Sequence, residues 1–341
     1  MRHSYLTFFA ACLFLLTPAL FYAQANGVNQ SSSIEPLASK SLLLDISTIA
    51  QSRLVAVGQH GNILTSDDAI SWQQANVPTQ STLTGVFFIN NNQGWAVGHD
   101  ATILHTNDGG LTWQLQQSLP QKEKPLFDVV FKDALHGIAV GAYGLFYRTV
   151  DGGKSWHNEF HSEFLNADDA QYIAELKAED EAAYQDEIGS ILPHFNRVIK
   201  ADNMLYLVGE IGLLASSSDF GRHWQMANEI YQGSFFDLLL TPEHSLLAVG
   251  LRGHIFRGNA AMEDWQQVNS KTSALLNSAL LTDDNRIIVL GNNGVLLTSK
   301  DDGKSYQVQT QKDGKALIAG VWFNHQLVAV SDVGIKIIKV K

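Results

Sequence analysis

Short apolar runs of four to seven residues follow one another along most of the 341-residue chain, separated by turns rich in Gly, Asp and Asn. Within these runs, an apolar residue followed by glycine recurs at a nearly constant interval. The marked positions are Gly58, Gly98, Gly141, Gly209, Gly250, Gly291 and Ser331, with spacings of 40, 43, 68, 41, 41 and 40 residues. The residue three positions after each mark is a glycine in six units and an alanine in one. In order, these residues are Gly61, Ala101, Gly144, Gly212, Gly253, Gly294 and Gly334. Such a period predicts seven copies of one structural unit.

Each unit is predicted to form four short strands. In the third unit the runs cover residues 127–132, 137–140, 145–149 and 155–160. This spacing is typical of an antiparallel all-β repeat, and four strands in about forty residues is the pattern of a propeller blade. The sequence therefore predicts an all-β fold, a single seven-bladed β-propeller domain over residues 26–341.

The last unit has only three apolar runs, at 317–323, 326–330 and 335–340. A propeller that is not closed leaves unpaired strand edges. We therefore expect the segment 33–39 to supply the missing outer strand of the last blade. The alternative is an N-terminal tail that takes no part in the sheet.

A second motif lies at the turn between the third and fourth strands of five units. The motif has five positions at fixed spacing. In order, these are a Ser or Thr, an Asp, a Gly or Ala, a second small or polar residue, and an aromatic residue. This is the Asp-box, and its aspartates are Asp67, Asp108, Asp151, Asp219 and Asp301. A carboxylate at such a turn accepts backbone N–H groups, and glycine supplies a positive φ. We therefore interpret these aspartates as structural, rather than as calcium ligands or catalytic acids.

Five Asp-boxes combined with the repeated apolar-Gly element resemble the photosystem II stability and assembly factor family, over essentially all of residues 26–341. The resemblance implies an exported, non-enzymatic, seven-bladed protein that helps a membrane complex to assemble by binding an incoming subunit. Relatives of that family also occur in bacteria that do not photosynthesise, so the match alone does not establish a photosynthetic role. The family carries an arginine patch on one face. The few arginines here do not match it: Arg53, Arg148, Arg197, Arg222, Arg252, Arg257 and Arg286.

Candidate binding residues follow from blade geometry, because the loop between the second and third strands lies on the same face as the blade-to-blade connections. Residues between the paired glycines should therefore point into one mouth of the central channel. The candidates at this mouth are His60, His99, Asp100, Tyr143, Glu210, Arg252, Asn292, Asn293 and Asp332. Thirteen residues before the marked glycines, small or polar residues interrupt the apolar inner strands, and the candidates for the channel lining are Asp45, Asp128, Asn196 and Asp237. A water-filled lining and a specific binding site both remain open for these residues.

The 68-residue spacing contains an insertion at about 158–190. Residues 167–188 have the composition of a helix, without Gly or Pro. From Glu159 to Glu187 there are ten acidic residues and one lysine, which gives a net charge of −9. The insertion joins an outer strand to the next inner strand, so it should emerge on the mouth face. It is either a solvated helix or a docking arm that steers a basic partner surface.

The first residues predict export. Residues 1–25 contain a basic start, an apolar run from Leu6 to Tyr22 and a small-x-small site, which together indicate a signal peptide cleaved before Asn26. An uncleaved anchor and lipid attachment at Cys12 are the alternatives. Cys12 is the only cysteine, so the mature chain would contain no disulfide and no thiolate metal ligand. We expect a periplasmic or secreted monomer without a membrane span after cleavage.

Charge and motif content argue against other classes of function. The formal net charge is −11, with 17% charged residues, which disfavours a nucleic-acid binder that works through a basic face. No paired histidine spacing or phosphate-binding loop indicates a metal or cofactor, so we expect none. Sialidases also carry Asp-boxes, but the arginine, tyrosine and glutamate pattern of that chemistry is not recognisable here. The first hypothesis is a non-enzymatic scaffold that binds a protein partner at the mouth. The alternative is a sialidase-like glycoside hydrolase or a degenerate carbohydrate-processing accessory protein.

Overall fold

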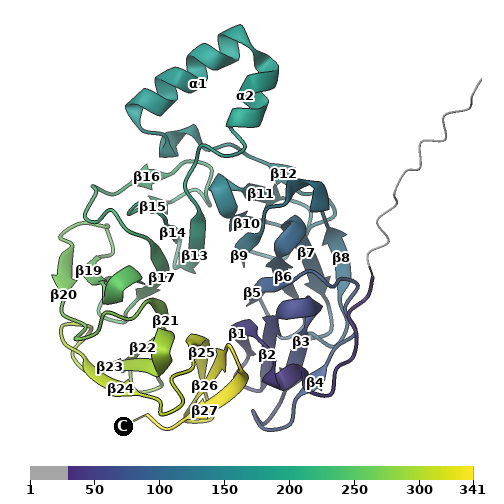
Figure 1. Ribbon diagram of the computed structural model, residues 1–341, viewed down its shortest axis with the longest axis vertical. Coiled ribbons are helices and arrows are strands. Elements are labelled where there is room, and N and C mark those ends of the chain that lie inside the picture. The colour runs from purple at the N-terminus through teal and green to yellow at the C-terminus, as the bar shows by residue number, and fades with distance from the viewer. Residues whose placement is uncertain (1–29, 341) are drawn as a thin grey trace, which may run out of the picture.

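Seven small antiparallel sheets surround a central channel in the structure, which is a computed structural model that describes residues 30–340 (Figure 1). The predicted seven-bladed propeller is confirmed. Six sheets have four strands and the seventh has three, each built from consecutive strands with the first strand innermost. The expected signal peptide and Cys12 lie outside the described residues. Within residues 30–340, no helix combines the length and apolar character that crossing a membrane requires.

The strands of each blade are given from the inside outward. Blade 1 contains β1 (Leu43–Ile49), β2 (Arg53–Gly58), β3 (Ile63–Ser66) and β4 (Gln73–Gln74), and blade 2 contains β5 (Leu83–Phe88), β6 (Gly94–Gly98), β7 (Thr102–Thr106) and β8 (Gln114–Gln117). Blade 3 contains β9 (Leu126–Phe131), β10 (Gly137–Gly141), β11 (Phe146–Thr149) and β12 (His157–Asn158), and blade 4 contains β13 (Phe195–Ala201), β14 (Met204–Gly209), β15 (Leu214–Ser217) and β16 (Gln225–Met226). Blade 5 contains β17 (Phe235–Leu240), β18 (Ser245–Gly250), β19 (Ile255–Asn259) and β20 (Gln266–Val268). Blade 6 contains β21 (Leu276–Leu281), β22 (Ile287–Gly291), β23 (Val295–Ser299) and β24 (Gln307–Thr310). Blade 7 contains β25 (Leu317–Phe323), β26 (Gln326–Ser331) and β27 (Gly334–Ile338).

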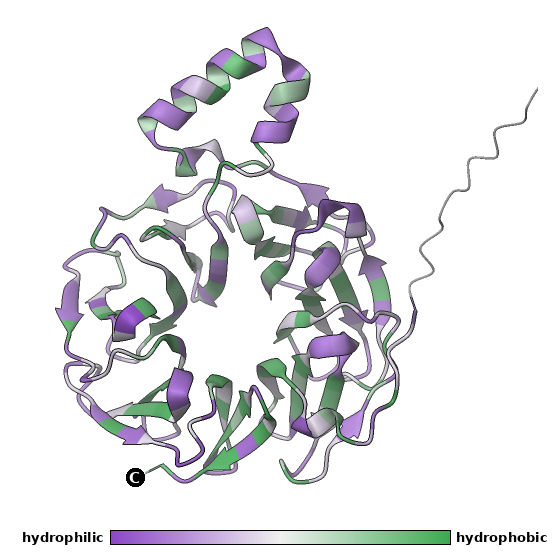
Figure 2. Ribbon diagram, viewed as in Figure 1, coloured by the Kyte–Doolittle hydropathy of each residue, from purple (hydrophilic) through white to green (hydrophobic). Residues whose placement is uncertain are grey.

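The hydrophobic core consists of seven clusters, one at each junction between neighbouring blades. The second strand of each blade is buried almost throughout, because the sheets on both sides cover it. This burial explains the continuous apolar runs before the marked glycines. In Figure 2 the hydrophobic colour follows the inner strands, whereas the outermost strands and the short turns that face the viewer are mostly hydrophilic.

The ring closes by packing and not by a shared strand, so the expectation that residues 33–39 complete the last blade is wrong. Blade 7 contains only β25, β26 and β27. The N-terminal segment follows the outer edge of blade 1 instead, where the Ser32 N–H donates to the Val77 carbonyl at 2.8 Å. Pro36 lacks an N–H and disfavours a strand there. The segment then forms the short 3-10 turn η1 (Ala38–Lys40), and Ala38 is buried between blades 7 and 1.

The insertion forms two helices where the sequence suggested one helical stretch. Asn166 caps α1 (Ala167–Glu179) and Asp180 caps α2 (Glu181–Glu187), each by accepting backbone N–H groups with its side chain. Because Asp180 begins α2, it also interrupts the helix after Glu179. The base of the insertion is anchored by Phe164 and Leu192 in the core between blades 3 and 4. The pair of helices projects outward from the rim and does not cover the channel (Figure 1).

Candidate binding site at the channel mouth

The Asp-box carboxylates form hydrogen bonds within their own turns. In blade 3 the Asp151 carboxylate accepts from the Ser155 N–H at 3.0 Å, from the Ser155 hydroxyl at 2.7 Å and from the Thr149 hydroxyl at 2.8 Å. Asp108, Asp219 and Asp301 make corresponding bonds. These bonds occupy the carboxylates within their own turns, which fits a structural role.

Blade 1 departs from this pattern by one residue. Asp68, and not the predicted Asp67, accepts from the N–H groups of Ile70 at 2.8 Å and Ser71 at 2.7 Å. Asp67 pairs instead with Arg53 at 2.7 Å. The first Asp-box turn is therefore one residue shorter than the others.

The loops between the second and third strands are tight turns on the opposite face. Five of them are 3-10 turns: η2 (Gln59–Gly61), η3 (His99–Ala101), η5 (Ala142–Gly144), η7 (Leu251–Gly253) and η8 (Asn292–Gly294). The middle residue of each turn is left-handed, with φ between 54° and 59°. The preceding glycine is required by close approach, because a Cβ on Gly98 would lie 2.1 Å from the Thr82 carbonyl oxygen.

Most of the candidates in these turns form an outer ring on this face and do not line the channel. Of the nine, only Glu210 borders the channel cavity. Asp100 accepts from the Ser81 hydroxyl at 2.6 Å, and Asn292 accepts from the Asn277 amide at 3.0 Å. Within residues 30–340, the other exposed candidates have no side-chain hydrogen bond: His60, His99, Arg252, Asn293 and Asp332.

Tyr143 belongs to an aromatic patch at the junction of blades 3 and 4. Its ring packs edge-on against His194 at a centroid distance of 4.5 Å, and His194 also lies 5.8 Å from the ring of Phe127. The Lys124 ammonium lies over the Tyr143 ring at 5.4 Å. His194 Nδ1 is 3.5 Å from Glu210, which brings the patch to the channel cavity. Tyr143 is 46% exposed, so this patch is open to a ligand.

The channel cavity has a volume of about 520 Å³, and Asp45, Asn196 and Asp237 are among the residues that line it. Arg197 on β13 also lines this cavity. The guanidinium is 3.4 Å from Asp237, 3.5 Å from Asp128 and 3.8 Å from Asp45. Three candidates that are far apart in the sequence therefore converge on one arginine, which sequence reasoning did not select.

A one-residue difference in hairpin length explains why Arg197 was missed. Asp45 pairs with Val57 and Asp237 with Val249, and the corresponding partner of Val208 in blade 4 is Arg197, not Asn196. The β13–β14 hairpin turns over two residues, with Ala201 opposite Met204, so a fixed offset of thirteen residues selects the wrong position. A search for the ladder partner in place of a constant offset would find Arg197.

The polar residues of the inner strands also connect the blades, with two kinds of bond in alternation. In blades 1, 3 and 5 an aspartate accepts a backbone N–H of the next blade: Asp45 from Val86 at 2.9 Å, Asp128 from Val198 at 2.9 Å and Asp237 from Ala279 at 2.8 Å. In blades 2, 4 and 6 a side chain donates to a carbonyl of the next blade: Thr84 to Leu126 at 2.6 Å, Asn196 to Phe235 at 2.8 Å and Asn277 to Leu317 at 2.8 Å.

The three aspartates are held in a strongly charged environment. Burial raises the pKa of Asp45 to about 6, although Arg197 and the Val86 N–H act in the opposite direction. Burial likewise raises the pKa of Asp128 and Asp237 against the effect of Arg197. The charges of Asp128, Asp237 and Asp45 raise the pKa of Arg197, which therefore stays protonated.

Arg197 can still bind a ligand, because its side chain remains 34% exposed to the channel. Within the described part of the chain its buried Nε–H has no hydrogen-bond acceptor. The cavity thus combines a partly exposed guanidinium with a surplus of carboxylate charge, which suits a polar peptide segment. Residues 30–340 contain no cluster of three or more side chains placed to hold a metal ion.

Comparison with known proteins gives a consistent result. The model of a family described as photosynthesis system II assembly factor YCF48 matches residues 64–125. A photosystem II assembly protein Ycf48 from Thermosynechococcus vestitus is 26% identical over 234 residues, covering 68% of this chain and 60% of that protein. A photosystem II assembly lipoprotein Ycf48 from Prochlorococcus marinus strain MIT 9312 is 28% identical, covering 70% of this chain and 78% of that protein.

The structural similarity extends over the whole propeller. A structure described as YCF48 bound to D1 peptide matches with a TM-score of 0.66 and 19% identity, covering 90% of this chain and 95% of that one. YCF48 from Cyanidioschyzon merolae matches with the same TM-score over 89% of this chain and 97% of that one, at 16% identity. The chain is therefore similar to the Ycf48 family in sequence and in fold. The resemblance inferred from the Asp-boxes and the repeated glycines is confirmed, although the alignment spans only 60% of the Thermosynechococcus protein.

The arginines of this Ycf48-like chain are dispersed by structural roles. Arg53, Arg257 and Arg286 each pair with an aspartate near the Asp-box face, and Arg148 pairs with Glu159. Arg197 alone contributes to the channel cavity.

Proposed function

We propose that this Ycf48-like protein is an exported, non-enzymatic assembly factor that binds a protein partner on its channel-mouth face. The partner is proposed to be a subunit of a membrane or envelope complex. The observation that carries this proposal is the juxtaposition of Arg197, whose side chain is 34% exposed to the channel, and the exposed patch of Tyr143 and His194 at the junction of blades 3 and 4. A related protein described as bound to D1 peptide supports a peptide ligand.

The chemistry of this face suits an extended segment. The guanidinium of Arg197 can donate to a backbone carbonyl or a carboxylate, and aromatic residues supply large contact area at low cost in side-chain entropy. Glu210 and the channel aspartates favour a cationic group nearby. The residues lining the cavity combine one arginine with aspartates and no tyrosine, which favours the binding protein over a sialidase-like hydrolase.

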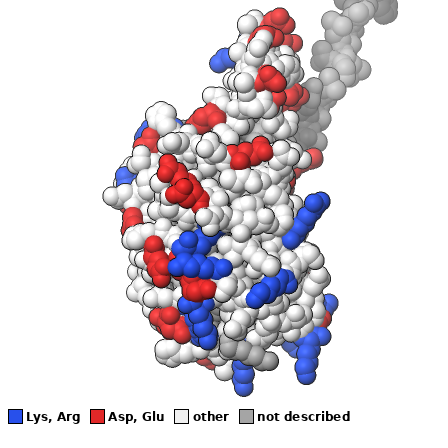
Figure 3. Space-filling view, turned by 90° about the vertical axis from the view of Figure 1, so that its left-hand side faces the viewer, with Lys and Arg blue, Asp and Glu red and all other residues white. Residues whose placement is uncertain are grey.

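The helical insertion is proposed to guide the partner and not to form the main contact. Figure 3 shows acidic residues gathered on these helices at the top of the molecule, well away from the lower blades. A net charge of −9 over Glu159 to Glu187 attracts a basic surface over about 8 Å at physiological salt. This contribution should appear in the association rate and fall with added salt.

Affinity capture from a detergent-solubilised native envelope tests the proposal, with residues 26–341 immobilised and bound proteins quantified by mass spectrometry. The double variant Tyr143→Ala/His194→Ala should reduce recovery of the partner at least tenfold. Glu243→Ala changes an exposed residue in the β17–β18 turn on the opposite face and is the matched control. Equal recovery by the double variant and the control would refute binding at the mouth.

Deletion of residues 167–187 tests the arm separately. The shortened chain should keep its melting temperature, because the anchoring residues Phe164 and Leu192 are retained. Its association rate with the captured partner should fall at low salt and match that of the intact chain at high salt. An unchanged rate at low salt would show that the insertion is not a docking arm.

Export is tested by N-terminal sequencing of the protein purified from its native envelope. A first residue of Asn26 is the expected result. A lipidated Cys12 would contradict it. Lipidation is the alternative to test because the Prochlorococcus relative is named a lipoprotein.

A further inference from the structure

The junction of blades 6 and 7 lacks a component that every other junction contains. In each of the other six junctions, the aromatic residue of an Asp-box, or its counterpart in blade 5, packs into the cluster shared with the preceding blade. These residues are Trp72, Trp113, Trp156, Trp224, Trp265 and Tyr306. The cluster between blades 6 and 7 has Trp322 from β25 and Val340 at its edge instead.

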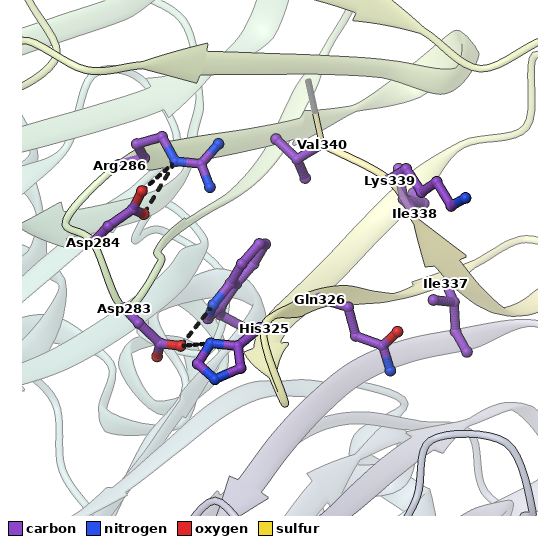
Figure 4. A pocket seen from close by; sticks show the side chains of 10 residues that line it. Asp283, Asp284, Arg286, His325, Gln326, Ile337, Ile338, Lys339 and Val340 are labelled. Atoms are coloured by element: carbon purple, nitrogen blue, oxygen red, sulfur yellow. Dashed lines mark hydrogen bonds and ion pairs between the residues drawn. The ribbon is translucent and has the colours of Figure 1, made fainter.

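An open groove of about 710 Å³ lies at this place, on the Asp-box face, and Figure 4 shows the side chains that line it. Arg286 forms one wall. It occupies the position in blade 6 that Arg53 occupies in blade 1, five residues before the marked glycine. The Arg53 guanidinium lies against the Asp-box turn of the next blade, because its Nη1 would be 3.5 Å from a Cβ added to Gly109 in that turn. Arg286 has no such turn beside it within residues 30–340, and bonds to Asp284 at 2.9 Å instead.

The adjoining strand β27 is an open edge. It pairs with β26 on one side, and no described residue pairs with its other side. The hairpin turns over two residues, with Ser331 opposite Gly334. Bonding alternates along an antiparallel ladder from such a turn, so Ile335 and Ile337 direct their backbone N–H and C=O groups outward. Ile337 is 46% exposed.

The side chains of β27 indicate what a fourth strand would need. Ile338 lies in the cluster shared with blade 6, whereas Ile335 packs toward blade 1. Lys339 follows on the same face as Ile335 and Ile337, is exposed, and has no acidic partner within residues 30–340. A strand added to this edge would place one face toward the groove and the other beside Lys339. Two residues of opposite charge that face each other on neighbouring strands stabilise the pairing of those strands.

We propose that the groove and the edge of β27 form a second binding site, which takes an extended segment of a partner protein as the fourth strand of blade 7. The segment carries a Trp or Tyr that packs into the groove beside Trp322, where the other junctions have an Asp-box aromatic residue, and an acidic residue on its other face opposite Lys339. The six complete junctions show what fits such a position. Main-chain bonds to β27 supply affinity, and the groove supplies specificity, as in other cases of strand addition. This site is independent of the channel mouth.

The probe for this site is a fluorescein-labelled peptide with the sequence of residues 106–117, which contains an Asp-box, Trp113 and an outer strand. Binding to residues 26–341 is measured by fluorescence anisotropy. The peptide should bind saturably, and its Trp113→Ala form should bind at least tenfold more weakly. A Gln114→Glu/Gln116→Glu form should bind more tightly, and Lys339→Ala in the protein should remove that gain. Absence of binding, or equal binding of the Trp113→Ala peptide, overturns the proposal.

Two protein variants separate the strand edge from the side chain. Ile337→Ala keeps the outward N–H, whereas Ile337→Pro removes it without removing a bond to β26. Ile337→Pro should weaken peptide binding about tenfold relative to Ile337→Ala, and Tyr143→Ala at the mouth should change nothing. Equal affinities for the two Ile337 variants overturn strand addition. Sedimentation is measured in parallel, and a dimer that Ile337→Pro dissociates would show that a second copy of the chain is the occupant, which also overturns the proposal. The peptide comparisons use the unaltered protein, so they decide the matter even if Ile337→Pro fails to fold.

Discussion

Replacement of Arg197 by methionine removes the one Lys or Arg side chain that lines the channel cavity within residues 30–340, while keeping a side chain of similar length. Three buried carboxylates then face one another without the guanidinium that lies 3.4 to 3.8 Å from them. Loss of one partner from a buried ion pair costs about 3–5 kcal/mol. Because the Arg197 side chain is 34% exposed and water reaches it, we expect a loss of about 2–3 kcal/mol at pH 7.5.

The effect should depend on pH in a defined direction. The pKa of Asp45 is about 6 in the folded protein and 3.8 without the fold, so folding favours the protonated form. The difference corresponds to about 3 kcal/mol of stability, which is fully present below pH 3.8 and lost as the pH rises through 6. Without Arg197 the pKa values of Asp45, Asp128 and Asp237 rise further. The loss caused by the substitution should therefore be small at pH 4.5 and reach its full size near pH 8.

Urea unfolding followed by tryptophan fluorescence provides the assay, since the chain contains seven tryptophans. The free energy of unfolding is measured for the natural protein and Arg197→Met between pH 4.5 and pH 8. Arg197→Lys keeps a positive charge and should lose less than half as much. If Arg197→Met loses the same free energy at every pH, the side chain acts by packing, and the electrostatic reasoning is refuted.

Three further substitutions test the junctions and turns by the same assay. Arg148→Ala should cost about 3 kcal/mol, because the guanidinium donates at 2.8 Å to the carbonyls of Phe220 and Gly221 in the next blade; a loss below 1 kcal/mol would contradict this. Gly98→Ala should abolish the cooperative transition or cost more than about 3 kcal/mol, because the new methyl group would meet a backbone carbonyl. Gly314→Ala has open space at φ +63° and should cost only about 1 kcal/mol, which makes it the matched control.

The sequence alone was sufficient for the fold, because the glycines and aspartates that identify it act locally. Gly98 is needed where two backbones come close, and Asp151 closes its turn with bonds to residues within four positions. Such requirements recur in most of the blades, so their period is visible without any knowledge of contacts between blades. The number of strands in the first six blades followed in the same way, whereas the fourth strand expected in blade 7 is absent from residues 30–340.

The composition of the site could not be predicted equally well, because it depends on the lengths of individual turns. A constant offset selected Asn196 where the two-residue hairpin of blade 4 places Arg197. The same kind of difference moved the first Asp-box from Asp67 to Asp68. Residues 33–39 illustrate a second limit, since their preference for blade 1 over blade 7 arises from a few long-range bonds such as that between Ser32 and Val77. Periodicity carries no information about bonds of this kind.

The alternation of bonds around the channel stops at one junction of the ring. Aspartates that accept an N–H and side chains that donate to a carbonyl connect six successive junctions, from Asp45 between blades 1 and 2 to Asn277 between blades 6 and 7. Because seven is an odd number, two bond types cannot alternate all the way around a ring of seven blades. Ile318 and Ala319 take the corresponding positions in blade 7, so apolar packing around Ala38 holds the junction with blade 1. Blade 7 is also the blade with the unpaired outer edge, so the missing inner bond and the surface proposed for strand addition lie on the same blade.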